Sequence, residues 1–480
     1  MTTTSTAIRS PLVRLPTNVA GLDTILRGGL FCGGVYMIQG VPGAGKTILA
    51  NQICFSILGS GGKVVYMTLL AESHSRLIQQ LQSLRFFDRT ALPDRIYYVS
   101  AFRQLQTGGL SGILSTAQSE VASQGATMLV IDGVSVAAEA AQSVQEMKRL
   151  VHDLQALATF HGCTVLLLTS GNRSVTKSED TMVDGLLYLE AELSGAQPER
   201  RLSVIKSRGD AALSGAHSFL IDDTGLKIFP RLESVFDQPP GSAPAEAAVN
   251  SGVASLDAML DAGGLPACSS TVVMGPSGSG KTSLALQFLS QCSAESPGLA
   301  LGFFESPERL LRKADALGLA LREAVRLAAV EFIWRAPGSY LLDEIGYLLL
   351  EEIDKRGVQR LVIDGMAGIF GAIGYPQRQH RFVACLMNEI RRRGVTVMLT
   401  LETGATGPTS MLRAPDFGLS AWVDNLITLH QVRSGTGVAG ALSIGKIRDS
   451  GYDRSIRGFE ITGAGVAIGS QLALAERREV

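Results

Sequence analysis

Short apolar runs alternate along the chain with longer segments that show a helical pattern of apolar and polar residues. In the first half, the runs expected to form strands are residues 34–39, 63–69, 128–132, 164–170 and 185–189. In the second half they are residues 271–275, 299–305, 360–364, 396–401 and 425–429. Buried apolar strands separated by helices are typical of a mostly parallel sheet flanked by helices. The pattern therefore predicts an α/β fold in each half.

The two halves repeat the same landmarks in the same order. A glycine-rich segment ending in Gly-Lys-Thr occurs at residues 40–47 and again at residues 275–282, 235 positions later. Each is preceded by Leu-Asp and then Gly-Gly-Leu, and each is followed by an apolar run that ends in aspartate, Asp132 or Asp364. Landmarks that recur in order at nearly one period indicate a tandem duplication.

Length and composition place the boundary between the two copies. A chain of 480 residues is too long for one ordinary core, and two domains of roughly 200–250 residues are expected. The segment 233–248 is rich in Pro, Ala and Ser, and we interpret it as a linker. The first domain is therefore expected at 14–232 and the second at 249–470, followed by a short tail at 471–480.

Charge and cysteine usage narrow the class of protein. The formal net charge is −1, so the chain lacks the basic field that holds a polyanion, and a nucleic-acid partner is not expected. The six cysteines lack CxxC spacing, which suits core residues in a reducing compartment. The N-terminus has no apolar signal segment and no apolar run reaches 18 residues. These features predict a cytoplasmic protein without a membrane span.

The glycine-rich segments have the chemistry of a phosphate-binding loop, the Walker A motif or P-loop. Glycines let backbone N–H groups turn toward phosphate oxygens, the lysine neutralises the outer phosphates, and the threonine hydroxyl ligates Mg²⁺. Each segment follows an apolar run and opens a helical pattern, so ATP and Mg²⁺ are the predicted ligands. The predicted ATP-binding residues here are Gly43, Ala44, Gly45, Lys46, Thr47 and Ile48 in the first copy, and Gly278, Ser279, Gly280, Lys281, Thr282 and Ser283 in the second.

Two aspartates complete the predicted metal sites. Asp132 and Asp364 end hydrophobic runs, where a carboxylate holds a Mg²⁺-bound water beside the Walker threonine. The predicted metal ligands are therefore Thr47 with Asp132 in the first copy and Thr282 with Asp364 in the second.

Hydrolysis needs a further carboxylate that orients the attacking water. Glu72 and Glu305 follow the second apolar run of their copies, where such a group would face the nucleotide. They are therefore the catalytic candidates. The alternative is that each glutamate caps the helical segment that begins there.

These motifs resemble those of KaiC and its relatives, tandem RecA-like ATPases known from circadian clocks and from many bacteria without clocks. The resemblance covers residues 14–470 and implies two RecA-like domains that hydrolyse ATP. KaiC-type domains usually carry adjacent glutamates after the second strand, where this chain is aligned with Ala71-Glu72 and Phe304-Glu305. The loss of the first glutamate in each copy predicts slow hydrolysis.

A Lys-x-Arg element recurs near the end of each copy. The resemblance implies that its cations reach the nucleotide of the next subunit, where an arginine meets γ-phosphate charge bidentately. KaiC-like proteins form hexamers of two stacked rings, so a homohexamer with ATP sites between subunits is expected. The alternative is a pair of exposed cations on a strand. The predicted ATP contacts from this element are Lys206, Ser207 and Arg208 in the first copy and Lys446, Ile447 and Arg448 in the second.

The resemblance also bears on self-phosphorylation. In clock KaiC the second domain phosphorylates itself on adjacent Ser and Thr residues before its last core strand. This chain offers Ser420 there, followed by Ala421 in place of threonine. Ser420 is the candidate site for Ser/Thr autokinase activity, and the alternative is an ordinary loop serine. The tail after Ile468 is shorter than the clock protein's partner-binding extension, which favours a clock-independent relative.

Three functions are compatible with these motifs. The preferred one is a KaiC-like ATPase that acts as an oligomeric, nucleotide-dependent switch for signalling protein partners. A RecA- or RadA-like ATPase of DNA recombination or repair shares the core, but the near-neutral charge argues against it. A nucleotide-bound scaffold that does not hydrolyse ATP is suggested by the missing first glutamates. Salt-dependent DNA binding would identify the second function, and absence of phosphate release would identify the third.

Overall fold

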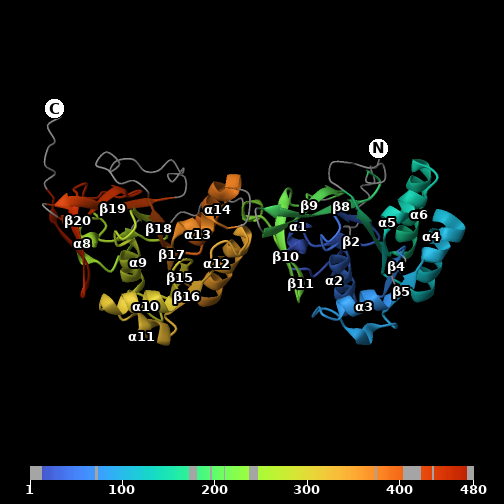
Figure 1. The fold of residues 1–480 in the computed structure, drawn as a ribbon, viewed down its shortest axis with the longest axis horizontal. Helices are drawn as coiled ribbons and strands as arrows, with labels where there is room; N and C mark the ends of the chain where they lie inside the picture. The colour runs from blue at the N-terminus through green and yellow to red at the C-terminus, as the bar shows by residue number, and fades with distance from the viewer. Residues whose placement is uncertain are drawn as a thin grey trace, which may run out of the picture. The chain divides into compact units, whose positions relative to one another are not determined.

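The computed structural model describes residues 13–70, 74–171, 181–194, 197–209, 211–236, 247–372, 376–403, 423–434 and 437–472. The chain divides between Val235 and Phe236 into two compact units (Figure 1). Within the described residues, each unit has one sheet of nine strands with helices packed against it. No helix of these stretches is long and apolar enough to cross a membrane.

The sheet of the first unit is parallel in its centre and is extended by antiparallel strands at one edge. The parallel strands are β3 (Val35–Gly40), β4 (Val64–Thr68), β5 (Ile96–Ser100), β6 (Met128–Asp132), β7 (Thr164–Ser170) and β8 (Gly185–Ser194). The antiparallel strands are β9 (Gln197–Ser207), β10 (Ala216–Asp222) and β11 (Gly225–Phe229). The strand order is β11-β10-β9-β8-β3-β7-β6-β4-β5. A separate pair joins β1 (Arg14–Leu15) to β2 (Leu30–Phe31).

The helices of the first unit are α1 (Leu22–Ile25), α2 (Lys46–Gly59), α3 (His74–Leu81), α4 (Phe102–Gln124), α5 (Val134–Ala140), α6 (Val144–His161) and α7 (Leu232–Val235), with a 3-10 turn at Arg89–Ala91. Helices α2 to α6 lie between successive parallel strands, whereas α1 lies between β1 and β2 and α7 follows β11. Helix α6 begins at a Ser143 cap, whose hydroxyl accepts a hydrogen bond from the Glu146 N–H at 3.2 Å. It ends at Gly162, whose φ of 63° reverses the chain as C-terminal glycines commonly do.

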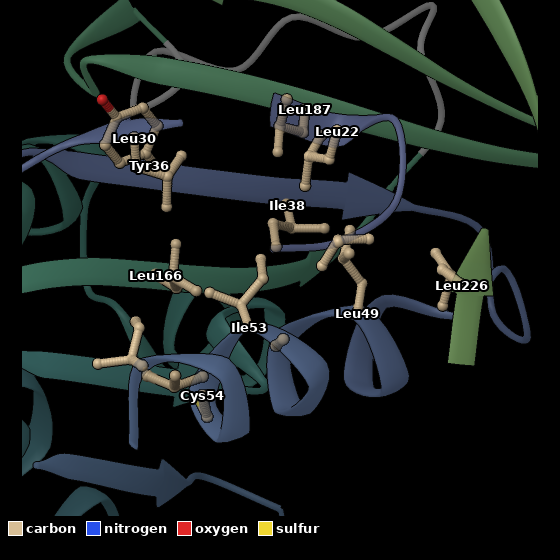
Figure 2. Close-up of a cluster of buried hydrophobic side chains, with 14 of the residues drawn as sticks. Leu22, Leu30, Tyr36, Ile38, Leu49, Ile53, Cys54, Leu166, Leu187 and Leu226 are labelled. Atoms are coloured by element: carbon tan, nitrogen blue, oxygen red, sulfur yellow. The ribbon is translucent and has the colours of Figure 1, made fainter. Parts of the chain in front are cut away.

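Helix α2 is fixed to the sheet by a buried apolar cluster (Figure 2). Leu49 and Ile53 of α2 lie against Ile38 of β3 and Leu166 of β7, and all four side chains are buried. Burying one such side chain stabilises the fold by about 1.5–3 kcal/mol. The cluster therefore holds the start of α2 at the end of β3, where the first glycine-rich segment lies.

The second unit repeats this arrangement. Its parallel strands are β14 (Ser270–Gly275), β15 (Gly298–Gly302), β16 (Val330–Trp334), β17 (Arg360–Asp364), β18 (Thr396–Glu402) and β19 (Asn425–Ser434). Its antiparallel strands are β20 (Gly437–Lys446), β21 (Arg457–Thr462) and β22 (Gly465–Gln471). The strand order is β16-β15-β17-β18-β14-β19-β20-β21-β22. A small pair joins β12 (Ala248–Val249) to β13 (Leu265–Pro266).

The helices of the second unit follow the same plan. They are α8 (Ala254–Asp257), α9 (Lys281–Leu289), α10 (Pro307–Ala316), α11 (Leu321–Arg326), α12 (Leu342–Arg356), α13 (Met366–Phe370) and α14 (Gln379–Arg392), with a 3-10 turn at Pro376–Arg378. Helix α9 begins at the lysine of the second glycine-rich segment, Lys281, as α2 begins at Lys46 of the first.

The predicted α/β fold, a mostly parallel sheet flanked by helices in each half, is confirmed. All ten predicted runs are strands, although the run at 299–305 ends as a strand at Gly302. Strands β5 and β16 were not predicted, because they lie at sheet edges and mix polar with apolar residues. The antiparallel strands at the other edge were also missed.

Candidate nucleotide-binding sites

The first P-loop runs from the end of β3 into α2. Gly43 and Gly45 have φ of 77° and 100°, in the left-handed region that favours glycine. Gly45 is the residue before α2, so the first N–H groups of the helix face the space over the loop. Helix N-termini of this kind attract phosphate. Gly278 and Gly280 repeat the geometry before α9, with φ of 74° and 99°.

The two Walker lysines are held in the same way. Lys46 Nζ donates to the carbonyl oxygens of Gly40 at 2.8 Å and Val41 at 3.0 Å. Lys281 Nζ makes the same two bonds in the second loop, at 2.9 and 2.7 Å. Burial lowers the pKa of both ammonium groups, while nearby carboxylates raise it. Each half-buried cation is thus held by the loop at the place where phosphate charge would compensate it.

Each Walker threonine meets the predicted aspartate. Thr47 Oγ1 donates to Asp132 Oδ2 at 3.3 Å, and Thr282 Oγ1 donates to Asp364 Oδ1 at 3.1 Å. Burial raises the pKa of both carboxyl groups, and hydrogen bonds to hydroxyls offset part of that rise. Hydroxyl and carboxylate oxygens are the ligands that Mg²⁺ prefers.

The loops have room and unmet hydrogen-bonding capacity for the predicted ligand. A Cβ built on Gly43 or Gly278 would meet no described atom within 4 Å. Among the described residues, the buried Ser279 hydroxyl has no hydrogen-bond partner. No group of three or more His, Cys, Asp or Glu side chains in the described stretches could hold a metal alone. The residues fit Mg²⁺ whose remaining ligands are phosphate oxygens and water.

The other predicted loop residues lie around this core. Ala44 is buried beneath the first loop. Ile48 and Ser283 lie in the first turns of α2 and α9, where their N–H groups belong to the helix N-terminus.

Two partners of the aspartates were missed from the sequence. In the first site, the buried Tyr66 hydroxyl donates to Asp132 Oδ2 at 2.9 Å. In the second site, Thr400 Oγ1 donates to Asp364 Oδ1 at 2.7 Å. Thr400 is itself oriented by the Gly365 N–H, which donates to its oxygen at 2.7 Å. The only signal in the sequence was a hydroxyl inside an otherwise apolar run.

Glu305 lies after β15 and is engaged by cations of α10. Both of its carboxylate oxygens accept from Lys313 Nζ, at 3.0 and 3.1 Å, and Arg309 Nε lies 3.6 Å away. The cap of α10 is Ser306, whose hydroxyl accepts from the Arg309 N–H at 3.4 Å. The alternative hypothesis that Glu305 caps this helix is therefore wrong. Burial is the largest cause of the raised pKa of Asp364, and the charge of Glu305 raises that pKa further.

Phe304 and Leu70 occupy matching positions in the two sites. A Cβ built on Gly365, directly after Asp364, would lie 2.9 Å from the Phe304 ring. A Cβ built on Gly133 would lie 3.0 Å from Leu70. Among the described residues, the counterpart of Phe304 by packing is therefore Leu70, one residue before Ala71, which lies outside them.

The following helices show that this offset does not extend to the candidate bases. Helices α3 and α10 begin at His74 and Pro307, two residues after Glu72 and Glu305 respectively. Glu72 therefore remains the sequence counterpart of Glu305. Both Ala71 and Glu72 lie outside the described residues, so the catalytic role of Glu72 stays a prediction.

The Lys-x-Arg elements lie at the end of the sheet where the parallel strands begin, whereas the P-loops lie at the opposite end, where β3 and β14 finish. Ser207, between Lys206 and Arg208, pairs with Gly185, which pairs with Tyr36 at the start of β3. The P-loop begins after Gly40, four residues or about 13 Å further along the strand. These cations therefore lie far from the P-loop of their own domain.

Within the isolated chain these cations bond to nearby oxygens. Lys206 Nζ donates to the Thr181 carbonyl, and Arg208 donates to the same oxygen at 3.1 Å. Arg208 also lies 3.7 Å from Asp184.

The second element is held more firmly. Lys446 Nζ donates to the Val423 carbonyl at 2.8 Å, and Arg448 donates to Asp424 Oδ1 at 3.0 Å. Arg391, at the end of α14, bonds to the other oxygen of Asp424. Ile447, between the two cations, is buried. The predicted phosphorylation site, Ser420, lies outside the described residues.

Known proteins are similar to this chain over nearly its whole length. A family profile described as "ATPase: KaiC" matches residues 15–233 and 249–473, which include both P-loops and both aspartates. The chain is 25% identical over 476 residues to the circadian clock oscillator protein KaiC of Picosynechococcus sp., covering 95% of this chain and 89% of that protein. It is 24% identical over 471 residues to the circadian clock protein KaiC2 of Synechocystis sp., covering 95% and 81%. It is 25% identical over 471 residues to the KaiC of Synechococcus elongatus, covering 95% and 88%.

Proposed function

Because this chain belongs to the KaiC family of ATPases, with two tandem RecA-like domains, we propose that each P-loop binds one Mg·ATP and hydrolyses it slowly. We further propose that the chain works in a ring whose nucleotide state is read by protein partners. The observation that carries the proposal is the repeated arrangement of lysine, threonine and aspartate. Lys46, Thr47 and Asp132 are brought together in the first domain as Lys281, Thr282 and Asp364 are in the second.

The residues of each site would share the work of binding and chemistry. The lysine and the helix N-terminus bind phosphate, and the threonine and aspartate hold Mg²⁺. When bound, the metal neutralises charge on the phosphates that are transferred. The protein's own task is then to orient a water molecule at the γ-phosphate.

The proposal of slow hydrolysis rests on that last task. Leu70 and Phe304 are apolar side chains beside the glycines that follow the metal-holding aspartates, and neither can accept a proton. Glu305 is bound to Lys313, and that ion pair must rearrange before the carboxylate can accept a proton from water. Loss of a well-placed general base typically costs about 10²–10⁴ in rate.

Ring assembly is supported by the place of the Lys-x-Arg elements. Because Arg208 lies at the end of the sheet opposite its own P-loop, a nucleotide that it contacts would belong to another site, and we propose one on a neighbouring subunit. We propose a homohexamer with ATP between neighbouring subunits, as the KaiC resemblance implies.

Autokinase activity in the second domain belongs to the same proposal. Ser420 precedes β19, the strand next to β14, which leads into the second P-loop. A Ser420→Ala variant should lose radiolabel transferred from γ-labelled ATP to the chain, and an undiminished signal would remove Ser420 from the proposal.

A scaffold that binds ATP without hydrolysing it is the second candidate, favoured by Leu70 and Phe304. Phosphate release at saturating Mg·ATP separates the two. We expect a slow rate that depends on protein concentration and vanishes in the double variant Lys46→Ala, Lys281→Ala. A wild-type rate no higher than that of the double variant would support the scaffold.

A further inference from the structure

The two metal-holding aspartates are oriented by hydroxyls that come from different strands. In the first site the hydroxyl of Tyr66, on β4, donates to Asp132 Oδ2 at 2.9 Å. In the second site the hydroxyl of Thr400, on β18, donates to Asp364 Oδ1 at 2.7 Å. The chemistry is the same, although the residues are not equivalent in the repeat.

The strand registers show which residues are equivalent. Thr68 of β4 lies opposite Asp132, as Gly302 of β15 lies opposite Asp364. Two residues back along each strand, Tyr66 therefore corresponds to Ala300, which has no hydroxyl.

A neighbouring strand shows the opposite difference, with the hydroxyl in the second domain and the apolar side chain in the first. Leu168 of β7 lies opposite Asp132. Thr400 of β18 follows Leu399, which lies opposite Ile363, so Thr400 corresponds to Leu168. Besides the Walker threonine, each aspartate thus has one further hydroxyl partner, which stands at a position where the other site has an apolar side chain.

The residues around Tyr66 also differ from their counterparts in the second domain. The Tyr66 ring packs on Tyr98, with centroids 5.2 Å apart. The Tyr98 hydroxyl donates to Asn51 Oδ1 at 2.8 Å, and Asn51 Nδ2 donates to the Thr47 carbonyl at 2.8 Å. Three polar side chains thus link both metal-holding residues, Thr47 and Asp132, to the strands β4 and β5.

In the second domain the counterparts of these three residues leave a cavity of about 10 Å³. Leu286 and Phe332 replace Asn51 and Tyr98, and Ala300 replaces Tyr66. The cavity is lined by residues that include Thr282, Leu286, Ala300, Phe332 and Asp364. A small cavity thus lies beside Ala300, the counterpart of Tyr66, and Asp364 accepts its further hydroxyl hydrogen bond from Thr400 instead.

We propose that Tyr66 is a positioning residue for Mg²⁺ in the first site, and that Thr400 has this role in the second. This inference rests on the proposed function, because it assumes that the aspartates face Mg·ATP. By donating to one carboxylate oxygen, the hydroxyl fixes the rotation of Asp132 and leaves the other oxygen to the metal's water. Groups that orient a metal-holding side chain typically contribute 10–100-fold to metal affinity.

The test measures metal binding rather than turnover. In the full chain with Lys281→Ala, which leaves only the first site, a fluorescent ATP analogue is titrated with Mg²⁺. We expect Tyr66→Phe to weaken the apparent Mg²⁺ affinity by about 10–100-fold. Binding of the analogue in excess EDTA should stay unchanged, since the lysine and the P-loop are intact.

A rescue variant uses the arrangement of the second site. Leu168→Thr places a hydroxyl at the position of Thr400, so Tyr66→Phe, Leu168→Thr should recover most of the lost Mg²⁺ affinity. Tyr340→Phe is the control, because it removes a buried tyrosine hydroxyl that donates to the Gly368 carbonyl at 2.8 Å, away from the aspartates. It should leave the Mg²⁺ titration unchanged.

Three outcomes would overturn the inference: no change in Tyr66→Phe, an equal change in Tyr340→Phe, or a loss that Leu168→Thr does not correct. If Tyr66→Phe does not fold, Thr400→Val in the Lys46→Ala chain makes the same test in the second site. Failure of the proposed function looks different, because the analogue would then bind without any dependence on Lys46 or Mg²⁺.

Discussion

At the scale of single residues, the proposed slow hydrolysis rests on Leu70 and Phe304, which follow β4 and β15. Phe304 stands beside the glycine after Asp364, and its side chain is 60% exposed. An exposed ring contributes little packing energy, so its replacement should disturb the core less than loss of a buried phenylalanine would. This position is therefore open to a direct test of the missing general base.

We expect Phe304→Glu to raise phosphate release from the second site at least about tenfold, because it supplies a carboxylate where the water must be oriented. The rate is measured in the Lys46→Ala chain, so that only the second site contributes. Phe304→Gln is the matched control, with the same shape and no charge. An equal gain in the glutamine variant would mean that removal of the ring, rather than a base, limits the rate.

At the scale of elements, helix α6 follows α5 and leads into β7, the strand beside β6, which ends at Asp132. Helix α6 packs on the sheet through buried residues that include Met147, Leu150 and Leu154. Two hydrogen bonds link the start of α6 to the residues before it. The Ser143 hydroxyl accepts from the Glu146 N–H, and the Glu146 carboxylate accepts from the Gln142 N–H at 2.8 Å. Reciprocal bonds of this kind satisfy helix N–H groups that have no partner within the helix.

We expect Ser143→Ala to lower the free energy of unfolding of the first domain by about 1 kcal/mol, the usual cost of a lost helix cap. Urea unfolding of the full chain, followed by circular dichroism, measures the change. Ser123→Ala, on the exposed face of α4, is the control. A Ser143→Ala chain as stable as the control would show that α6 is fixed by packing alone.

The sequence was sufficient for elements whose chemistry is local. The P-loop, the aspartate at the end of an apolar run and the helix after the loop are each contained in a few consecutive residues. Tyr66 and Thr400 were missed because their roles depend on which strands are neighbours, and the apolar pattern does not give strand order. The correspondence of Leu70 with Phe304 was missed for a similar reason, because it depends on the strand register and on packing against Gly133 and Gly365.

At the scale of the whole molecule, the proposed ring requires subunits to meet through their nucleotides. Arg208 is about half-exposed and lies 3.7 Å from Asp184, a contact loose enough to exchange for phosphate. Arg448 is held more closely by Asp424, which Arg391 also contacts. The first domain therefore has the arginine that is more available to a neighbour.

We expect Mg·ATP to convert the wild-type chain to a ring, and Arg208→Ala to weaken that ring while leaving the monomer folded. Light scattering with and without Mg·ATP measures the mass. Arg149→Ala, which removes a highly exposed arginine of α6, controls for loss of surface charge. A wild-type chain that stays monomeric at saturating Mg·ATP would contradict the ring.

The central claim is that one chain holds two ATP sites, one in each domain, and a count of bound ATP at equilibrium tests it most directly. We expect about two ATP for each wild-type chain, about one for Lys46→Ala and for Lys281→Ala, and almost none for the double variant, because each lysine supplies the charge nearest the outer phosphates. A double variant that still binds one ATP in each domain with wild-type affinity would contradict the account.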